Sequence, residues 1–431
     1  MDSINTSTNN KGKKFTKFII FWIGSLIAAI GSGMTAFGIG VYVFEISKSA
    51  TKKSMISLVA FLPTLLMSPL SGVLADKFDR RKMMILGDSL SLIGVFTAYY
   101  GIKHNFHPYI MILIGVFISA VFSSLIEPAS KATITDLVDE KDYTKATGLM
   151  QLAGSARFLV SPILSTLIMT SRGITTILII DMLTIFTTVA VVYYVRSSLD
   201  NKSITNEESI FKGFSTGLQA IKEKPGILVL VYFSILLTFM VGVIQELSVP
   251  MVLSFADKNS LSLALTISAT GMIVSSLYLG AREIQKDKLM ILSLSFFIAG
   301  LAMVGFASVE NIKVVTSFGF IFFMTLPFIN SLLDYFIRTN IANEVQARVW
   351  GLIGSLSQIG YLLAYGLSGL LADKIFIPLL KEGGSLANSI GRIIGIGPGR
   401  GVALFIIIAG ICLSITSIVI YKNKDIRSLK S

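Results

Sequence analysis

The sequence predicts an all-α membrane protein whose twelve transmembrane helices form two pseudo-symmetric six-helix bundles. Of its 431 residues, 53% are hydrophobic and 14% are charged, whereas a typical soluble domain has about 25% charged residues. The apolar residues form blocks long enough to span a bilayer as helices, which takes about 20 residues. The longest polar stretch, residues 197–224, divides six of these blocks from the other six.

The first six spans follow a polar, basic tail at residues 1–17, and they make up the N-terminal bundle, residues 18–196. No signal-peptide cleavage site follows the first apolar block, so we expect that block to be the first helix itself. Each span is an apolar block closed on both sides by a short polar loop. We place these spans at residues 18–44, 55–75, 83–101, 109–130, 145–169 and 174–195.

The last six spans make up the C-terminal bundle, residues 226–421, and a second tail follows at residues 422–431. We place these spans at residues 226–253, 261–281, 289–308, 314–337, 348–372 and 400–421. Between the bundles, residues 197–225 form a linker whose apolar residues are spaced for one face of a helix on the membrane surface. Lys82–Leu86 resembles Lys288–Leu292, which indicates duplication of the kind that builds many transporters.

The basic residues predict the orientation of the chain. If the N-terminus is cytoplasmic, 25 of the 37 Lys and Arg residues fall in cytoplasmic segments. Cytoplasmic loops are enriched in Lys and Arg, so we expect both termini in the cytoplasm and the protein in the cell membrane. The formal net charge of +12 then reflects topology and contact with lipid headgroups rather than binding to nucleic acid.

Several chemistries lack the residues they need. Cys412 is the only cysteine, and His104 and His107 share one loop without further ligands nearby, so no metal site is expected. No Gly-x-x-x-x-Gly-Lys-Ser/Thr motif for ATP is present. We therefore expect no enzyme activity and no cofactor.

One loop motif carries a specific signal. The loop between the second and third spans contains Gly72, Asp76, Arg80, Arg81 and Lys82, and it resembles the signature loop of the major facilitator superfamily. The glycine allows close helix approach, and the aspartate suits the positive N-terminal end of a neighbouring helix, with Arg81 as its ionic partner. The resemblance implies the major facilitator fold and a latch on the cytoplasmic face against the eleventh span. Asp79 replaces the usual glycine of the signature.

A second segment nearly repeats the start of this motif. Ser368–Lys374 matches Ser71–Lys77 at six of seven positions, but it lies at the outer end of the eleventh span and lacks the Arg-Arg-Lys. We interpret it as a coincidence or a packing feature and not as a second latch.

Further stretches resemble the macrolide-efflux branch of the drug:proton antiporters, among them Gly31–Phe37 and Gly395–Gly401. This resemblance implies a monomeric carrier that exports amphiphilic small molecules by proton antiport. Two departures from the pattern of proton-coupled exporters argue against proton coupling. The first half of span four has no arginine, and the Gly-Pro signature of span five is degenerate. Export of one endogenous metabolite, such as a siderophore or peptide, and a non-transporting scaffold or sensor remain alternatives.

Charged residues inside spans are costly and are therefore candidates for proton coupling. Glu127, beside Pro128 in span four, either couples protons or has a structural role, paired with Arg157 of span five or with a backbone group. Asp334 stands four residues before Arg338, the spacing of a helical ion pair. The full set of candidates is Glu127, Arg157, Asp181, Glu246 and Asp334.

The substrate cavity should lie between the central faces of the helices. Methionine and aromatic side chains suit binding of varied apolar molecules, although most of them serve packing or lipid contact. By position, the candidates are Met34, Phe37, Phe158 and Tyr361.

Overall fold

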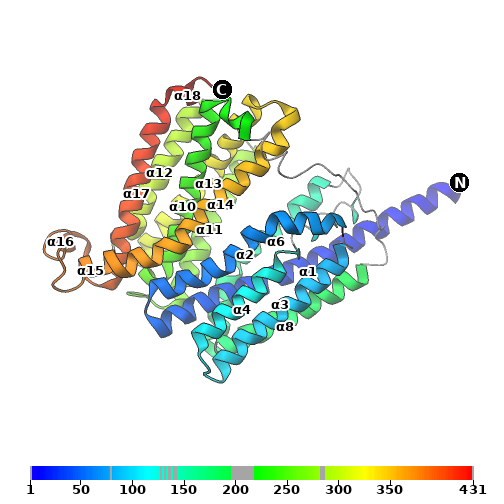
Figure 1. Ribbon diagram of the computed structural model, residues 1–431, viewed down its shortest axis with the longest axis horizontal. Coiled ribbons are helices and arrows are strands. Elements are labelled where there is room, and N and C mark those ends of the chain that lie inside the picture. The colour runs from blue at the N-terminus through cyan, green and yellow to red at the C-terminus, as the bar shows by residue number, and fades with distance from the viewer. Residues whose placement is uncertain are drawn as a thin grey trace. The chain divides into compact units, whose positions relative to one another are not determined.

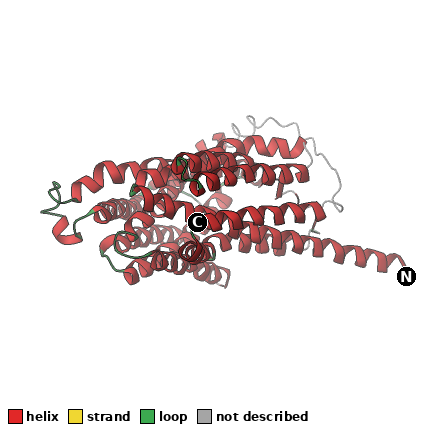
Figure 2. Cartoon of the chain, turned by 90° about the horizontal axis from the view of Figure 1, so that it is seen from below, coloured by secondary structure: helices red, strands yellow, loops and turns green. Residues whose placement is uncertain are grey.

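The computed structural model describes residues 2–77, 80–126, 129–130, 133, 137–138, 143–195, 218–281 and 287–429, without the side chains of 2–14, 68–77, 80–81, 143–145, 147, 343–344 and 347. Within this part of the chain every regular element is a helix, as Figure 2 shows. Eleven helices are long and apolar enough to cross a membrane, and a twelfth apolar helix, Pro108–Ser123, is shorter. The predicted all-α membrane class is confirmed.

The chain divides into two compact units, one of residues 1–43 and 56–206, the other of residues 44–55 and 207–431. The first unit contains most of α1 and α2 and all of the helices up to α8 (Figure 1). These helices are α1 (Asp2–Ser47), α2 (Ala50–Lys77), α3 (Arg80–Lys103), α4 (Pro108–Ser123), α6 (Tyr143–Leu159), α7 (Ser161–Arg172) and α8 (Ile174–Val195). The second unit also holds the connection between α1 and α2.

The second unit combines long apolar helices with short helical turns. The long helices are α10 (Pro225–Val252), α11 (Lys258–Ala281), α12 (Lys288–Ser308), α13 (Ile312–Asn340), α14 (Asn343–Leu371) and α17 (Pro398–Lys422). The short elements are the π-helical turn η3 (Ala372–Phe376), α15 (Ile377–Leu380), α16 (Gly391–Ile394) and α18 (Lys424–Arg427). Helix α12 packs on α13 and α17, α11 packs on α13, and α10 packs on α14.

The core of the first unit gathers apolar side chains from helices distant in the sequence. Phe18 and Phe21 of α1, Met83 and Met84 of α3 and Val192 of α8 are buried in one cluster. Glycine brings α3 and α4 closer still, because a Cβ on Gly94 would collide with the backbone of α4. Close approach through glycine is typical of membrane helices, whose association depends on packing.

Two helix boundaries have clear local causes. The predicted fifth span is broken at Val160, where α6 gives way to α7, and Pro162 in the first turn of α7 has no N–H to continue the ladder. Helix α7 then ends at Gly173, whose φ of +82° is readily accessible to glycine. The sixth predicted span, 174–195, coincides with α8.

Candidate functional site

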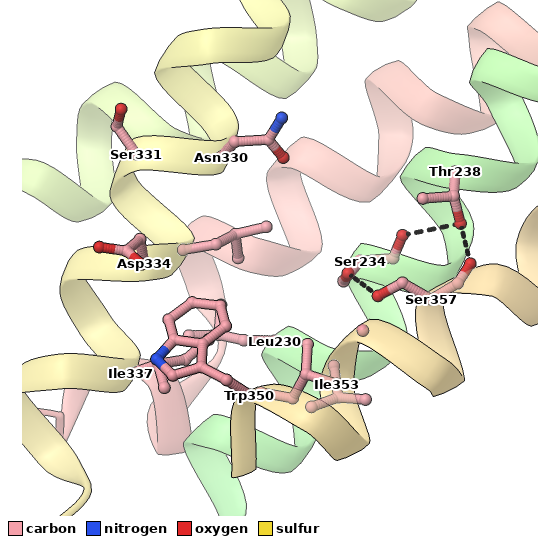
Figure 3. A pocket seen from close by; sticks show the side chains of 13 residues that line it. Leu230, Ser234, Thr238, Asn330, Ser331, Asp334, Ile337, Trp350, Ile353 and Ser357 are labelled. Carbon is pink, nitrogen blue, oxygen red and sulfur yellow. Dashed lines mark hydrogen bonds between the residues drawn. The ribbon is translucent and has the colours of Figure 1, made fainter. Parts of the chain in front are cut away.

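A cavity of about 550 Å³ lies within the second unit, between α10, α13 and α14 (Figure 3). Helices α10 and α14 approach closely on one side of it, because Gly360 of α14 packs against the backbone of α10. The lining mixes aliphatic, aromatic and polar side chains. It comprises Leu230, Val231, Ser234, Thr238, Asn330, Ser331, Leu333, Asp334, Ile337, Trp350, Ile353, Gly354 and Ser357.

Hydroxyl groups form one wall of the cavity. The Oγ atoms of Ser234 and Ser357 are 2.6 Å apart, and Thr238 donates to the carbonyl oxygen of Ser357 at 2.6 Å. Figure 3 shows these three side chains together where α10 meets α14. Since a hydroxyl is both donor and acceptor, this wall ties the helices together and keeps acceptor capacity for a ligand.

The opposite wall carries charge and an aromatic ring. The carboxylate of Asp334 accepts a hydrogen bond from Nε of Arg338 at 2.6 Å, which confirms the ion pair predicted from their spacing. The guanidinium of Arg338 lies 5.8 Å from the ring centre of Trp350. The indole N–H of Trp350 is buried and reaches no acceptor among the described residues. This wall therefore offers a ligand an aromatic surface and an unused donor.

Size and lining suit a small amphiphile. Ligand sites usually measure about 300–1,000 Å³ and combine an apolar lining with a few placed polar groups. Here Leu230, Ile337 and Ile353 supply the apolar surface, while Asn330 and Asp334 supply polar groups on α13. The arrangement holds no clustered nucleophile or acid–base pair that would indicate catalysis.

Two buried acids and one arginine form a second candidate site in the first unit. Asp181 of α8 is 4% exposed. The hydroxyl of Thr184 lies 2.8 Å from the backbone carbonyl oxygen of Asp181 and 3.4 Å from its carboxylate Oδ1, and it can donate to either oxygen. Gly31 of α1 packs directly against both residues. Arg157 of α6 is near enough to attract the Asp181 carboxylate. Asp181 and Arg157, both predicted candidates, are thus brought together.

Asp88 of α3 joins this group, although it is not among the residues predicted from the sequence. It is 8% exposed, its Oδ2 has no hydrogen-bond partner in the described part of the chain, and its charge is coupled to that of Asp181. The sequence contains a signal for Asp88, because an acidic residue inside an apolar span, here the third, is costly and therefore a candidate for function. The buried acids Asp88 and Asp181, together with the exposed Arg157, are called the acid cluster below.

Glu246 has a different environment. In the second unit its carboxylate pairs with Nζ of Lys53 at 2.9 Å, and the two side chains are 3% and 8% exposed. The predicted spans, 18–44 and 55–75, leave Lys53 in the loop between them. Helix α2 instead begins at Ala50, which carries Lys53 into a buried position.

The structure leaves the other predicted residues as predictions. Glu127 and the side chains of Gly72, Asp76, Arg80 and Arg81 are outside the described residues, while Lys82 is exposed. The four predicted cavity residues do not line this cavity: Met34 is 3% exposed, Phe158 is 60% exposed, and Phe37 and Tyr361 are half-buried. Their role in binding substrate stays a prediction.

Comparison with known proteins establishes the family. The sequence profile of the Major Facilitator Superfamily matches residues 21–365. The chain belongs to this superfamily. Like its relatives in the superfamily, it is a multi-pass membrane transporter and not an enzyme.

Two relatives and one solved structure illustrate the kinship. Over 369 residues the chain is 25% identical to macrolide efflux protein A of Streptococcus pyogenes, covering 83% of this chain and 90% of that protein. It is 22% identical to the multidrug efflux pump Tap of Mycobacterium bovis (strain BCG / Pasteur 1173P2), covering 85% and 88%. A bacterial homologue of the human lysosomal transporter Spinster shares the fold, with a TM-score of 0.71 and 12% identity over 95% and 96% of the two chains.

Proposed function

We propose that this transporter exports amphiphilic small molecules, macrolides among them, across the cell membrane by proton antiport with alternating access. The cavity between α10, α13 and α14 carries the proposal. Its aliphatic residues suit an apolar ring system, and Trp350 and Asp334 suit a ligand with hydrogen-bonding or cationic groups. The kinship with a macrolide efflux protein and a multidrug pump supports export of such molecules.

The acid cluster supports proton coupling. Two buried carboxylates near each other repel when both are ionised, so such a pair readily retains a proton. Asp181 has a hydroxyl donor and a nearby arginine, whereas Oδ2 of Asp88 has no partner in the described part of the chain. In our proposal Asp88 takes up a proton on the outer side and loses it on the inner side.

Growth of an efflux-deficient bacterium that expresses the chain tests the proposal. We expect higher tolerance to macrolides and lipophilic cationic dyes, and loss of that tolerance when an uncoupler dissipates the proton gradient. Trp350→Ala should lower tolerance several-fold because it removes the aromatic wall of the cavity. The matched control Tyr232→Ala, on a 63% exposed side chain of α10, should not.

The screen also separates the alternatives. Tolerance to none of these compounds, together with export of a siderophore or peptide, would replace drug efflux by export of one endogenous metabolite. Transport of no compound under any gradient would favour a scaffold. Tolerance that survives the uncoupler would contradict proton antiport.

A further inference from the structure

The connection between α1 and α2 is built into the second unit. Residues 44–55 belong to that unit, although the rest of both helices belongs to the first. The chain reverses at Lys48, whose φ of +49° places it in the left-handed region, and α2 begins two residues later. The contacts of this short segment therefore decide how the start of α2 is held.

Asp373 caps the start of α2 from a distant part of the sequence. Its carboxylate accepts hydrogen bonds from Oγ of Ser49 at 2.6 Å, from the backbone N–H of Ala50 at 3.1 Å and from that of Thr51 at 2.9 Å. The first N–H groups of a helix lack partners within the helix, and the helix dipole favours a negative charge there. Asp373, directly after α14, supplies that charge.

A glycine allows this approach. A Cβ on Gly369 would collide with the carbonyl oxygen of Ala50, and Thr51 donates from Oγ1 to the carbonyl oxygen of Gly369 at 3.1 Å. The packing expected of Ser368–Lys374 is therefore present. In this segment the glycine allows close helix approach and the acid faces a helix N-terminus. These are the roles predicted for Gly72 and Asp76 at the cytoplasmic face.

A buried ion pair holds the same segment against α10. Nζ of Lys53 donates to the carboxylate of Glu246 at 2.9 Å and to the carbonyl oxygen of Gln245 at 3.1 Å. The Gln245 side chain is held in turn by the hydroxyl of Tyr365 on α14, at 3.0 Å. Removing one partner of a buried pair leaves an unpaired charge, whereas separating both into water restores their hydration. Such a contact is strong while closed and can still open.

We propose that Asp373 and the Lys53–Glu246 pair form a releasable latch, which closes the predicted outer face of the transporter and opens once in each export cycle. The latch rests on the proposed function in one respect: alternating access requires the start of α2 to leave α10 and α14 when the outer face opens. Its contacts are hydrogen bonds and charges that water can replace. This proposal reverses the interpretation from the sequence, in which Ser368–Lys374 is not a second latch. The segment becomes the outer counterpart of the predicted inner latch at Gly72–Lys82.

Accessibility of one buried position tests the latch. Ser54 lies beside Gly369 and is 2% exposed, so Ser54→Cys should react slowly with a membrane-impermeant maleimide added to whole cells. Cys412, which is exposed, is first replaced by serine. Asp373→Ala should raise the labelling rate about fivefold, the size expected when a helix cap is lost. Lys53→Met should raise it by about a hundredfold, because the buried Glu246 charge loses its partner.

Asp287→Ala is the matched control. Asp287 caps α12 through the backbone N–H groups of Leu289 and Met290, by the same chemistry but away from this segment. Its removal should leave the labelling rate within twofold of the parent. The exchange Lys53→Glu with Glu246→Lys should restore slow labelling that Lys53→Glu alone loses, which excludes simple misfolding.

Unchanged labelling in both Asp373→Ala and Lys53→Met, in protein that remains monodisperse, would overturn the latch. An equal rise in Asp287→Ala would overturn it too. The assay needs neither substrate nor gradient. If labelling depends on Asp373 but the protein moves no compound, the latch is supported and drug export is refuted. If the protein exports drugs in a proton-dependent way but labelling is unchanged in the variants, drug export is supported and the latch is refuted.

Discussion

Asp334, Glu246 and Asp88 all stand in apolar helices, yet each has different neighbours. Asp334 pairs with Arg338 four residues later, a contact that helical spacing predicts. Glu246 pairs with Lys53, which is 193 residues away, so no local pattern could reveal it. Asp88 has one carboxylate oxygen without a partner in the described part of the chain. Sequence reasoning finds such acids, but only the fold assigns their partners.

The Lys53–Glu246 pair makes a residue-scale prediction about stability. Lys53→Met or Glu246→Leu alone should lower the free energy of unfolding by about 3 kcal/mol, because one charge stays buried without its partner. The double variant Lys53→Met with Glu246→Leu should recover most of that loss. Thermal unfolding in detergent measures the cycle, and additive single effects would show that the two charges are not coupled.

Asp88 makes a residue-scale prediction about coupling. Asp88→Asn keeps the shape of the side chain but cannot release a proton. We expect it to abolish gradient-driven export while substrate still exchanges for substrate across the membrane, because exchange needs no net proton transfer. Asp425→Asn, an exposed position on α18, is the control. Normal gradient-driven export by Asp88→Asn would remove Asp88 from the mechanism.

At the scale of elements, apolar block length predicts the helices well, and local chemistry modifies their ends. Helix α8 has the predicted bounds, whereas the fifth span breaks at Val160 before Pro162. The first helix is the opposite case, since its backbone remains helical from Asp2, through residues predicted to be a polar tail. The cavity arises where three helices meet, and no pattern within one helix indicates it.

Glycine contacts give a prediction for paired helices. Gly94→Ala should lower the free energy of unfolding by about 1–3 kcal/mol, because its Cβ would meet the backbone of α4 in a well-packed contact. Gly154→Ala is the matched control, since no heavy atom lies near a Cβ at that helical position. Alanine there should stabilise the helix by up to about 1 kcal/mol. Similar effects of the two substitutions on thermal unfolding would refute the packing argument.

Helix capping gives a prediction with a pH dependence. Hydrogen bonds from Ser260 lower the pKa of Asp257, which precedes α11 and lies in the loop after α10. Its stabilising contribution is therefore complete above the unfolded-state pKa of about 3.9 and is lost as the pH falls through the lower folded-state value. Asp257→Ala should lower the melting temperature at neutral pH, and this difference should shrink in strong acid. A difference independent of pH would contradict the role of the charge.

For the whole molecule, composition alone identifies a multi-pass membrane protein, and the signature loop identifies the superfamily. The sequence does not indicate that residues 44–55 join the second unit, because this depends on contacts with Asp373 and Glu246 more than 190 residues away. A carrier that alternates between two open states must exchange such contacts in every cycle. In our proposals the outer latch serves gating and the acid cluster serves proton coupling, and the two lie on residues of different units.

The most direct test of proton-coupled export uses purified protein in proteoliposomes and a radiolabelled macrolide. With an imposed gradient that is acidic inside, proton antiport predicts that the macrolide accumulates in the lumen while protons leave it, so that the lumen becomes more alkaline. Both should disappear in Asp88→Asn and when an ionophore collapses the gradient. Equal macrolide movement with and without the gradient, or accumulation that leaves the internal pH unchanged, would contradict proton-coupled export.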